Sequence, residues 1–220
     1  ILEIFTKDHG KHRGLIRGLH SKNNRSNIEP GNEVAATWSG RLETHLGNYS
    51  IESIKSWSSL VLQYKDRLLA ISSLCSLISL SMAEGQPNLD IYSSSKEMIK
   101  KISNNDNHWT REYIFWEMNL LSDIGYGLDL SECAVTSKLK NLSYVSPSSG
   151  RAVTEKGAGD YKSKLLPLPK FLTCDDNNYS NSDIYNGLNL TEFFFKKRFF
   201  EPNNLNFPQS RNRLKEIFNK

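Results

Sequence analysis

The amino-acid sequence predicts an α+β fold in which a small β-barrel is followed by a mainly α-helical domain. Short strand-like segments separated by Gly, Asn and Asp occupy roughly the first 55 residues. Beyond residue 57, apolar residues recur at three- and four-residue spacing, which is typical of helices that bury one side. We therefore predict a barrel domain at 1–55 and a helical domain at 56–220.

Four segments of the first domain have strand character. The first two are 2–5 and 14–19, and a turn at 8–11 separates them. After a polar loop at 21–27 and a turn at 29–32, two more follow at 34–39 and 47–54. Several short strands in sequence predict a meander that forms a small barrel.

The remaining elements are predicted helices. The first carries its apolar positions between Leu60 and Met82, and a Gly-Gln-Pro sequence ends it. Two more are predicted at 89–102 and 108–124. The stretch 131–160 is rich in Ser, Gly and Thr and is predicted to be irregular. Helical spacing returns at 188–200 and 208–219.

Charge is unevenly distributed along the chain. The 220 residues include 28 Lys and Arg and 24 Asp and Glu, a formal net charge of +4. Six Lys or Arg and one Asp fall between Lys7 and Arg25, so this segment carries +5 and the rest of the chain sums to −1. All of the net basicity therefore lies in the first 25 residues.

Several classes of protein are excluded. The longest uncharged run, between Arg67 and Glu84, holds 16 residues, whereas a membrane span needs roughly 20 apolar ones. The first residues do not resemble a secretory signal. Three cysteines lie far apart with no C-x-x-C pair, as expected of free thiols in a reducing cytosol. We expect a cytoplasmic protein without membrane partners.

Motifs for catalysis and metal binding are lacking. A structural zinc site needs four ligands, usually in two close pairs, but each cysteine stands alone. Cys75 falls on the apolar face of a predicted helix, where a small hydrophobic residue is the usual explanation. There is no G-x-S-x-G or H-E-x-x-H motif, and 157–160 is a turn rather than a phosphate loop. We predict no catalytic residue, metal or cofactor.

The basic segment indicates nucleic-acid binding. A solvated, functionally neutral face is the usual explanation of such a run. Here, however, the charges are nearly unmixed and lie on glycine-flanked strands and a loop rather than on a helix with i,i+4 partners. Unopposed cations on a barrel form a track for phosphates, and Trp38 or Tyr49 would supply a surface on which bases stack.

A second unusual run spans 193–200, where three basic residues are flanked on both sides by phenylalanines. Helical spacing places Phe193, Phe199 and Phe200 near one side, so core packing with a solvated basic face is the favoured interpretation. The functional alternative is a hydrophobic groove with a cationic rim, suited to an acidic peptide that ends in an aromatic residue. Its candidate residues are Phe193, Lys197, Arg198 and Phe200.

Six segments of the sequence stand out together: 8–11 (DHGK), 14–18 (GLIRG), 29–47 (EPGNEVAATWSGRLETHLG), 125–130 (GYGLDL), 133–136 (CAVT) and 144–153 (YVSPSSGRAV). They resemble the bacterial recombination mediator RecO family, most closely its alphaproteobacterial branch. Each segment is short, but their order and spacing are specific, and the match covers most of the chain.

The resemblance implies an N-terminal OB-fold followed by a helical domain, and no covalent chemistry. Proteins of this family bind single- and double-stranded DNA and anneal complementary strands. They work with RecR, often also RecF, to load RecA onto DNA coated by single-strand-binding protein, whose acidic, Phe-ending tail they dock. The resemblance supports the basic strands as a DNA track with these residues: Lys11, Arg13, Arg17, Lys22, Arg25 and Arg41.

The sequence departs from the family in two places. Some members carry a zinc finger with two C-x-x-C pairs, but here Cys133 is followed at the partner position by Thr136, and the second pair is absent around 153–156. We therefore expect no zinc. Members also have more than a dozen residues before the equivalent of Ile1, including the first barrel strand, so we expect this barrel to lack that strand.

Two other function classes remain as alternatives. One is a protein–protein adaptor whose basic strands contact acidic partners and which has no direct role on DNA. The other, with less support, is a small-molecule or metal enzyme.

Overall fold

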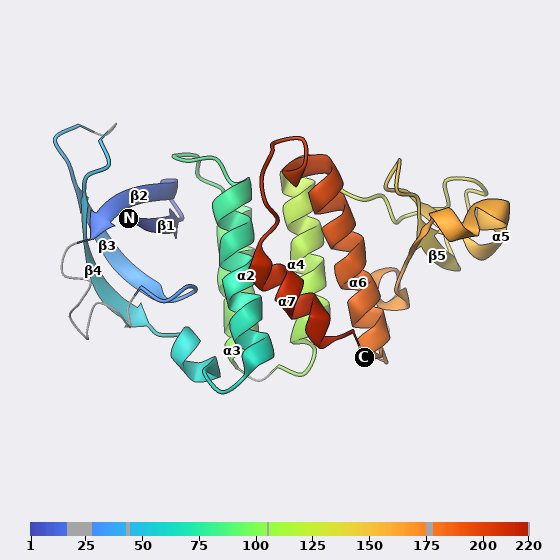
Figure 1. Ribbon diagram of the computed structural model, residues 1–220, viewed down its shortest axis with the longest axis horizontal. Helices are drawn as coiled ribbons and strands as arrows, with labels where there is room; N and C mark the ends of the chain where they lie inside the picture. Colours follow the sequence, from blue (N-terminus) through green and yellow to red (C-terminus); the bar gives the residue numbers. More distant parts are fainter. Residues whose placement is uncertain (17–27, 43–44, 105, 175–177, 220) are drawn as a thin grey trace. The chain divides into compact units, whose positions relative to one another are not determined.

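The computed structural model describes residues 1–16, 28–42, 45–104, 106–174 and 178–219 (Figure 1). The chain divides into two compact units, Ile1–Asp106 and Asn107–Lys220. Strands open the first unit and helices dominate the rest, so the predicted α+β class is confirmed. Within the described residues, no helix combines the length and the apolar character needed to cross a bilayer.

Four strands form the sheet of the first unit: β1 (Leu2–Thr6), β2 (Gly10–Ile16), β3 (Glu33–Ser39) and β4 (Asn48–Lys55). Their order is β1-β2-β4-β3, with β1 antiparallel to β2, β3 antiparallel to β4, and β2 parallel to β4. Strand β2 starts earlier than predicted because Gly10, at φ +63°, closes a tight turn and pairs with Thr6. Strands β1 and β3 are the outer members of this sheet.

Two helices complete the first unit, α2 (Lys65–Ser81) and α3 (Leu89–Ser103), after a 3-10 turn at Ser58–Val61. Asn88 starts α3 by accepting a hydrogen bond from the Ile91 amide at 2.9 Å. Arg67 of α2 donates to the carbonyl oxygens of Ile102 and Asp106. These bonds join α2 to the end of α3.

The second unit contains α4 (Trp109–Asp123), α6 (Asn181–Phe194) and α7 (Gln209–Ile217). Ser180 and Asp183 form a capping box at the start of α6. The core lies between α4 and α6, and Glu117 of α4 meets Arg211 of α7 there with both side chains fully buried. The helices predicted at 60–82, 89–102, 108–124 and 208–219 thus correspond to observed ones, with boundaries shifted by a few residues.

The prediction that 131–160 is irregular is wrong in part. Strands β5 (Leu142–Val145), β6 (Ala152–Thr154) and β7 (Leu166–Pro167) form a small sheet in the order β6-β5-β7. A short helix α5 (Glu155–Ala158) and a 3-10 turn (Gly159–Lys164) follow β6, and another 3-10 turn spans Lys170–Leu172. Strands of two to four residues are too short for alternation to reveal them.

The aromatic-basic run also differs from the prediction. Helix α6 ends at Phe194, and Phe195–Phe200 form a π-helical turn. Because the wider turn adds a residue, it rotates the later side chains relative to α-helical spacing. Phe194, Phe195 and Phe200 are buried, whereas Phe193 and Phe199 are half-buried.

Candidate nucleic-acid interface

The two candidate stacking residues lie together on the sheet of the first unit. Trp38 of β3 is directly opposite Tyr49 of β4. His12 of β2 packs edge-on against both rings, at centroid distances of 5.5 Å from Trp38 and 5.8 Å from Tyr49. The Nδ1 atom of His12 lies 2.6 Å from the Tyr49 hydroxyl, and burial, with the charge of Glu84, raises the pKa of Tyr49.

Glycines make room for these rings. A Cβ atom at Gly14 would lie 2.6 Å from the Tyr49 ring, and one at Gly40 or Gly47 would lie within 2.5 Å of the Trp38 ring. The Trp38 indole nitrogen also donates to the Leu46 carbonyl oxygen at 3.1 Å. Trp38 is therefore held by its own strand and the following loop.

Lys11 is not placed as the prediction of a phosphate contact requires. Its side chain is only 6% exposed, and its ammonium donates to the Ser79 carbonyl oxygen of α2 at 2.5 Å. Its backbone carbonyl also accepts from the Gly85 amide. In this conformation Lys11 joins β2 to the helices rather than facing a ligand.

Arg13 and Arg41 are exposed. The Arg13 side chain is 48% exposed, and its Nε atom lies 3.0 Å from Glu3 and 3.8 Å from Glu84. Arg41 lies in the loop after β3. Three further predicted contacts fall outside the described residues: Arg17, Lys22 and Arg25.

Strand β2 carries two of the predicted cations, Lys11 and Arg13, on one face and His12, which contacts the candidate stacking rings, on the other. Side chains alternate along a strand, so His12 points away from the face that carries Lys11 and Arg13. His12 contacts Trp38 and Tyr49, whereas Lys11 reaches α2. Lys11 and Arg13 therefore do not share a face of β2 with the residue that contacts the candidate stacking rings.

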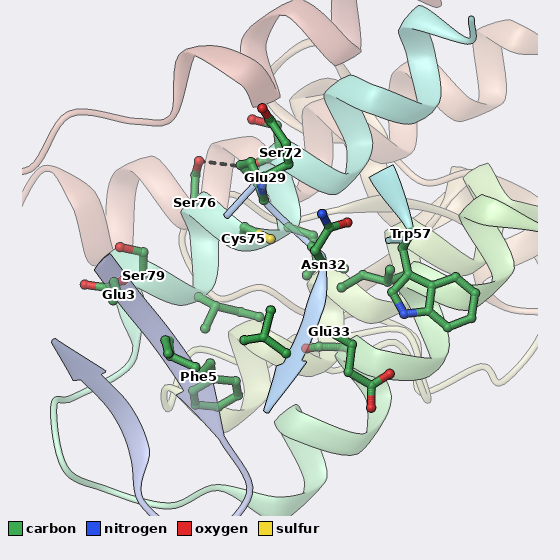
Figure 2. Close-up of a pocket in the computed structure, with 18 of the residues that line it drawn as sticks. Glu3, Phe5, Glu29, Asn32, Glu33, Trp57, Ser72, Cys75, Ser76 and Ser79 are labelled. Atoms are coloured by element: carbon green, nitrogen blue, oxygen red, sulfur yellow. Dashed lines mark hydrogen bonds between the residues drawn. The ribbon is translucent and has the colours of Figure 1, made fainter. Parts of the chain in front are cut away.

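Sequence reasoning missed a cavity of about 580 Å³ in the first unit. It lies between outer strands β1 and β3 and helices α2 and α3 (Figure 2). Figure 2 shows the polar side chains of α2 that line it, Ser72, Cys75, Ser76 and Ser79. Their spacing of three and four residues along one helix is the sequence signal that could have indicated it.

The charges around this cavity do not suit a phosphate. Three carboxylates line it, those of Glu3, Glu29 and Glu33, against two cations. The ammonium of Lys96 is bonded to Glu33 at 2.5 Å, and that of Lys11 is bonded to Ser79. Its walls otherwise include apolar residues from both outer strands, so the cavity is not part of a DNA track.

The four residues of the predicted partner groove do not all line one surface of the second unit. Phe200 is 1% exposed and contacts the ring of Phe207 at a centroid distance of 5.1 Å, so it belongs to the core. Phe193 is half-buried, and the exposed Lys197 lies 5.3 Å from its ring centroid. Arg198 lies over Phe194 at 4.7 Å and donates to the Ser148 carbonyl oxygen at 3.2 Å. Phe193 and Lys197 are the two members that face outward together.

No group of three or more His, Cys, Asp or Glu among the described residues is arranged to hold a metal ion. The thiols of Cys75 and Cys174 differ in setting. Burial raises the pKa of Cys75 to about 12, while Cys174 is exposed. Cys133 is buried near Thr154.

Comparison with known proteins identifies the family. A family model described as Recombination protein O N terminal matches residues 1–57, and one described as Recombination protein O C terminal matches 65–204. The DNA repair protein RecO of Ruegeria sp. (strain TM1040) is 36% identical over 198 residues, which cover 90% of this chain and 81% of that protein.

Other relatives match over a greater length. The DNA repair protein RecO of Rhodospirillum rubrum is 34% identical over 98% of this chain and 88% of its own length. That of Methylocella silvestris is 35% identical over all of this chain and 89% of its own length. The N-terminal domain of the family is OB-fold-like, in agreement with the predicted barrel. This chain belongs to the RecO family of DNA repair and recombination proteins.

Proposed function

We propose that this chain is a non-enzymatic recombination mediator. It binds single- and double-stranded DNA, anneals complementary strands and helps to load RecA onto DNA coated by single-strand-binding protein. Phosphate contacts come from the first unit, and partner proteins bind the second. Membership of a DNA repair family supports this role, and the exposed arginines of the first unit support the place of the DNA contact.

The observation that carries the DNA contact is the exposure of Arg13 and Arg41. Arg13 lies on β2, the strand that leads directly into the segment bearing Arg17, Lys22 and Arg25. Arg41 lies in the loop after β3. An arginine exposed to solvent binds phosphate oxygens in a bidentate manner and releases counterions from the DNA.

A salt titration tests this proposal. Contact with several phosphates makes the logarithm of the affinity for a labelled oligonucleotide fall linearly with the logarithm of salt concentration. Arg41→Ala should reduce that slope by about one unit. Lys140→Ala, which removes an exposed cation of the second unit, is the matched control and should keep the parent slope. If Arg41→Ala keeps the salt dependence of the wild-type chain, Arg41 does not contact the DNA and the proposed location of the contact is wrong.

Annealing is tested separately. Complementary labelled strands coated with single-strand-binding protein are mixed with and without the chain, and pairing is followed by fluorescence transfer. The proposal expects faster pairing with the chain present. Pairing at the uncatalysed rate would contradict the mediator role even if DNA binding were retained.

Partner docking is proposed for the second unit. RecR, and in some cases RecF, are the expected protein partners, together with the acidic tail of single-strand-binding protein. For that tail we propose the surface formed by Phe193 and Lys197, a half-buried aromatic ring beside an exposed cation. Lys197→Ala should weaken binding of a labelled tail peptide more than Lys156→Ala, an exposed control on α5. Equal affinities of the two variants for the tail peptide would show that the tail binds another surface.

One observation favours the adaptor alternative. The first unit exposes large apolar side chains on and near its sheet: Leu15, Leu42, Leu46 and Ile54. Large apolar side chains left exposed on a domain are available for contacts with other proteins. An adaptor would bind DNA weakly and with a salt slope that neither Arg13→Ala nor Arg41→Ala changes.

A further inference from the structure

Two turns of the second unit bring four sequence positions to one point. Cys133 and Thr136 form one i,i+3 pair, and Thr154 and Gly157 form another. The Cys133 Sγ atom lies 3.5 Å from Thr154 Oγ1, and Thr136 Oγ1 also lies 3.5 Å from Thr154 Oγ1. A Cβ atom built at Gly157 would lie 3.1 Å from both Cys133 Sγ and Thr154 Oγ1. All four positions therefore point into the same small volume.

This arrangement has the dimensions of a four-cysteine zinc knuckle. Two sulfurs bound tetrahedrally to one zinc ion at about 2.3 Å lie about 3.8 Å apart. The observed separations of 3.5 Å between the side-chain atoms are close to that value. The second pair, absent from the sequence around 153–156, corresponds in space to Thr154 and Gly157.

The residues present do not fit zinc. Structural zinc takes four thiolate, imidazole or carboxylate ligands. Here one position offers a thiol, two offer hydroxyl groups, and Gly157 offers no side chain. The residues that the structure describes include no other His, Cys, Asp or Glu grouped with Cys133 to complete a set of three.

Hydrogen bonds hold the two turns together instead. The Cys133 sulfur is fully buried and accepts from the amides of Thr136 at 3.4 Å and Thr154 at 3.3 Å. Thr154 Oγ1 accepts from the Gly157 amide at 3.1 Å, which starts α5. Burial alone would raise the pKa of Cys133, but hydrogen bonds from Thr136, Thr154 and the Val135 backbone outweigh it and lower the pKa to about 6.

We infer that this cluster is a metal-free knuckle, in which donors converging on the Cys133 sulfur join the two turns in place of a metal ion. The backbone retains the cage of a zinc site. Gly157 has no positive φ, so a side chain there is compatible with the backbone, although its neighbours must shift by a few tenths of an ångström. Thr136→Cys, Thr154→Cys and Gly157→Cys together should therefore convert the knuckle into a zinc site.

Metal analysis tests the inference in both directions. The wild-type chain, purified from zinc-containing medium, should carry far less than one zinc per chain, and a chelator should leave its unfolding midpoint unchanged. The triple variant should carry about one zinc per chain and lose unfolding stability on chelation. With Co²⁺ it should show the absorption of a tetrahedral thiolate site. Stoichiometric zinc in the wild type, or a folded triple variant that takes up no metal, would overturn the inference.

A second measurement keeps the inference testable if the triple variant does not fold. In wild type, the amides of Thr136 and Thr154 should be protected from hydrogen exchange. Cys133→Ala should remove that protection, and Cys133→Ser, which retains an acceptor, should preserve part of it. The control Cys174→Ala removes an exposed thiol and should leave the exchange protection of both amides unchanged. Unchanged protection in Cys133→Ala would show that the sulfur does not hold the turns.

Discussion

Replacing Glu117 by Gln should destabilise the second unit strongly. Glu117 accepts from the Nε and Nη2 atoms of Arg211, at 2.5 and 2.9 Å, and from the Thr191 hydroxyl at 2.5 Å. All three side chains are fully buried. Burial alone would lower the pKa of Arg211, and the charge of Glu117 raises it instead. The glutamine amide keeps the shape of the side chain but leaves the guanidinium without its counter-charge.

The size of the effect follows from this burial. Removing one partner of a buried ion pair costs about 3–5 kcal/mol, because the remaining charge cannot return to water. A domain is stable by about 5–15 kcal/mol in total, so the loss is a large fraction of it. Arg211 also donates to the Leu188 carbonyl oxygen at 2.8 Å, so the pair joins α4, α6 and α7, and its loss should loosen all three helices.

Denaturant unfolding followed by circular dichroism measures this cost. Glu155→Gln breaks an exposed pair with Lys162 and is the matched control, expected to have no measurable effect. Replacing both buried partners, Glu117→Leu with Arg211→Met, should recover most of the stability lost in the single variant. A loss below about 1 kcal/mol in Glu117→Gln would show that water reaches the pair and would refute the reasoning.

Three further predictions concern the first unit and the buried thiol. Glu3→Gln removes the carboxylate that pairs with Arg13 and so frees Arg13 to bind phosphate. The affinity for DNA should rise and its dependence on salt concentration should steepen; an unchanged salt dependence in anisotropy titrations would contradict this. Gly47→Ala should cost about 1–3 kcal/mol or more in denaturant unfolding, because Gly47 has φ +57° and its new Cβ would lie 2.3 Å from the Trp38 ring. Gly85 also has a positive φ, +72°, but no atom lies near its Cβ position, so Gly85→Ala carries the backbone strain without a clash. It should therefore lower the free energy of unfolding by less than Gly47→Ala does. The pKa of the Cys133 thiol is about 6 in the folded chain and 9.0 for an ordinary cysteine. Between these two pH values the thiol is protonated in the unfolded chain and deprotonated in the folded one. The free energy of unfolding should therefore rise with pH from about 6 to 9, and Cys133→Ser should lack that part of the rise.

The candidate DNA site shows where sequence reasoning reached its limit. A run of cations and two nearby aromatic residues predicted one track, because all of them fall within the first 55 residues. The pleat of β2 separates His12 from Lys11, and cross-strand pairing places His12 beside Trp38 and Tyr49. Which face each residue occupies depends on register with partner strands, and a local pattern does not carry that information.

The run at 193–200 gives a second example. Its composition predicts a helix with an aromatic side, and the chain is helical there. Phe200 is buried and Lys197 exposed, as that interpretation predicted, but the chain leaves α-helical spacing at Phe195, so Phe194 and Phe195 are buried while Phe193 and Phe199 are half-buried. One extra residue in a helical turn changes which side chains face the solvent, and no propensity indicates where it will be inserted.

The sequence by itself determined the fold class, the strands of the first 55 residues and the long helices that follow, the concentration of positive charge near the N-terminus and the resemblance to the RecO family. These depend on local periodicity, composition and motif order, all of which can be counted along the chain. Only the tertiary structure decided that Lys11 is buried against α2, that Glu117 and Arg211 pair across 94 residues, and that Cys133, Thr136, Thr154 and Gly157 share one cage. Each of these depends on contacts between segments distant in the chain, where burial and hydrogen bonding are set by packing rather than by neighbouring residues.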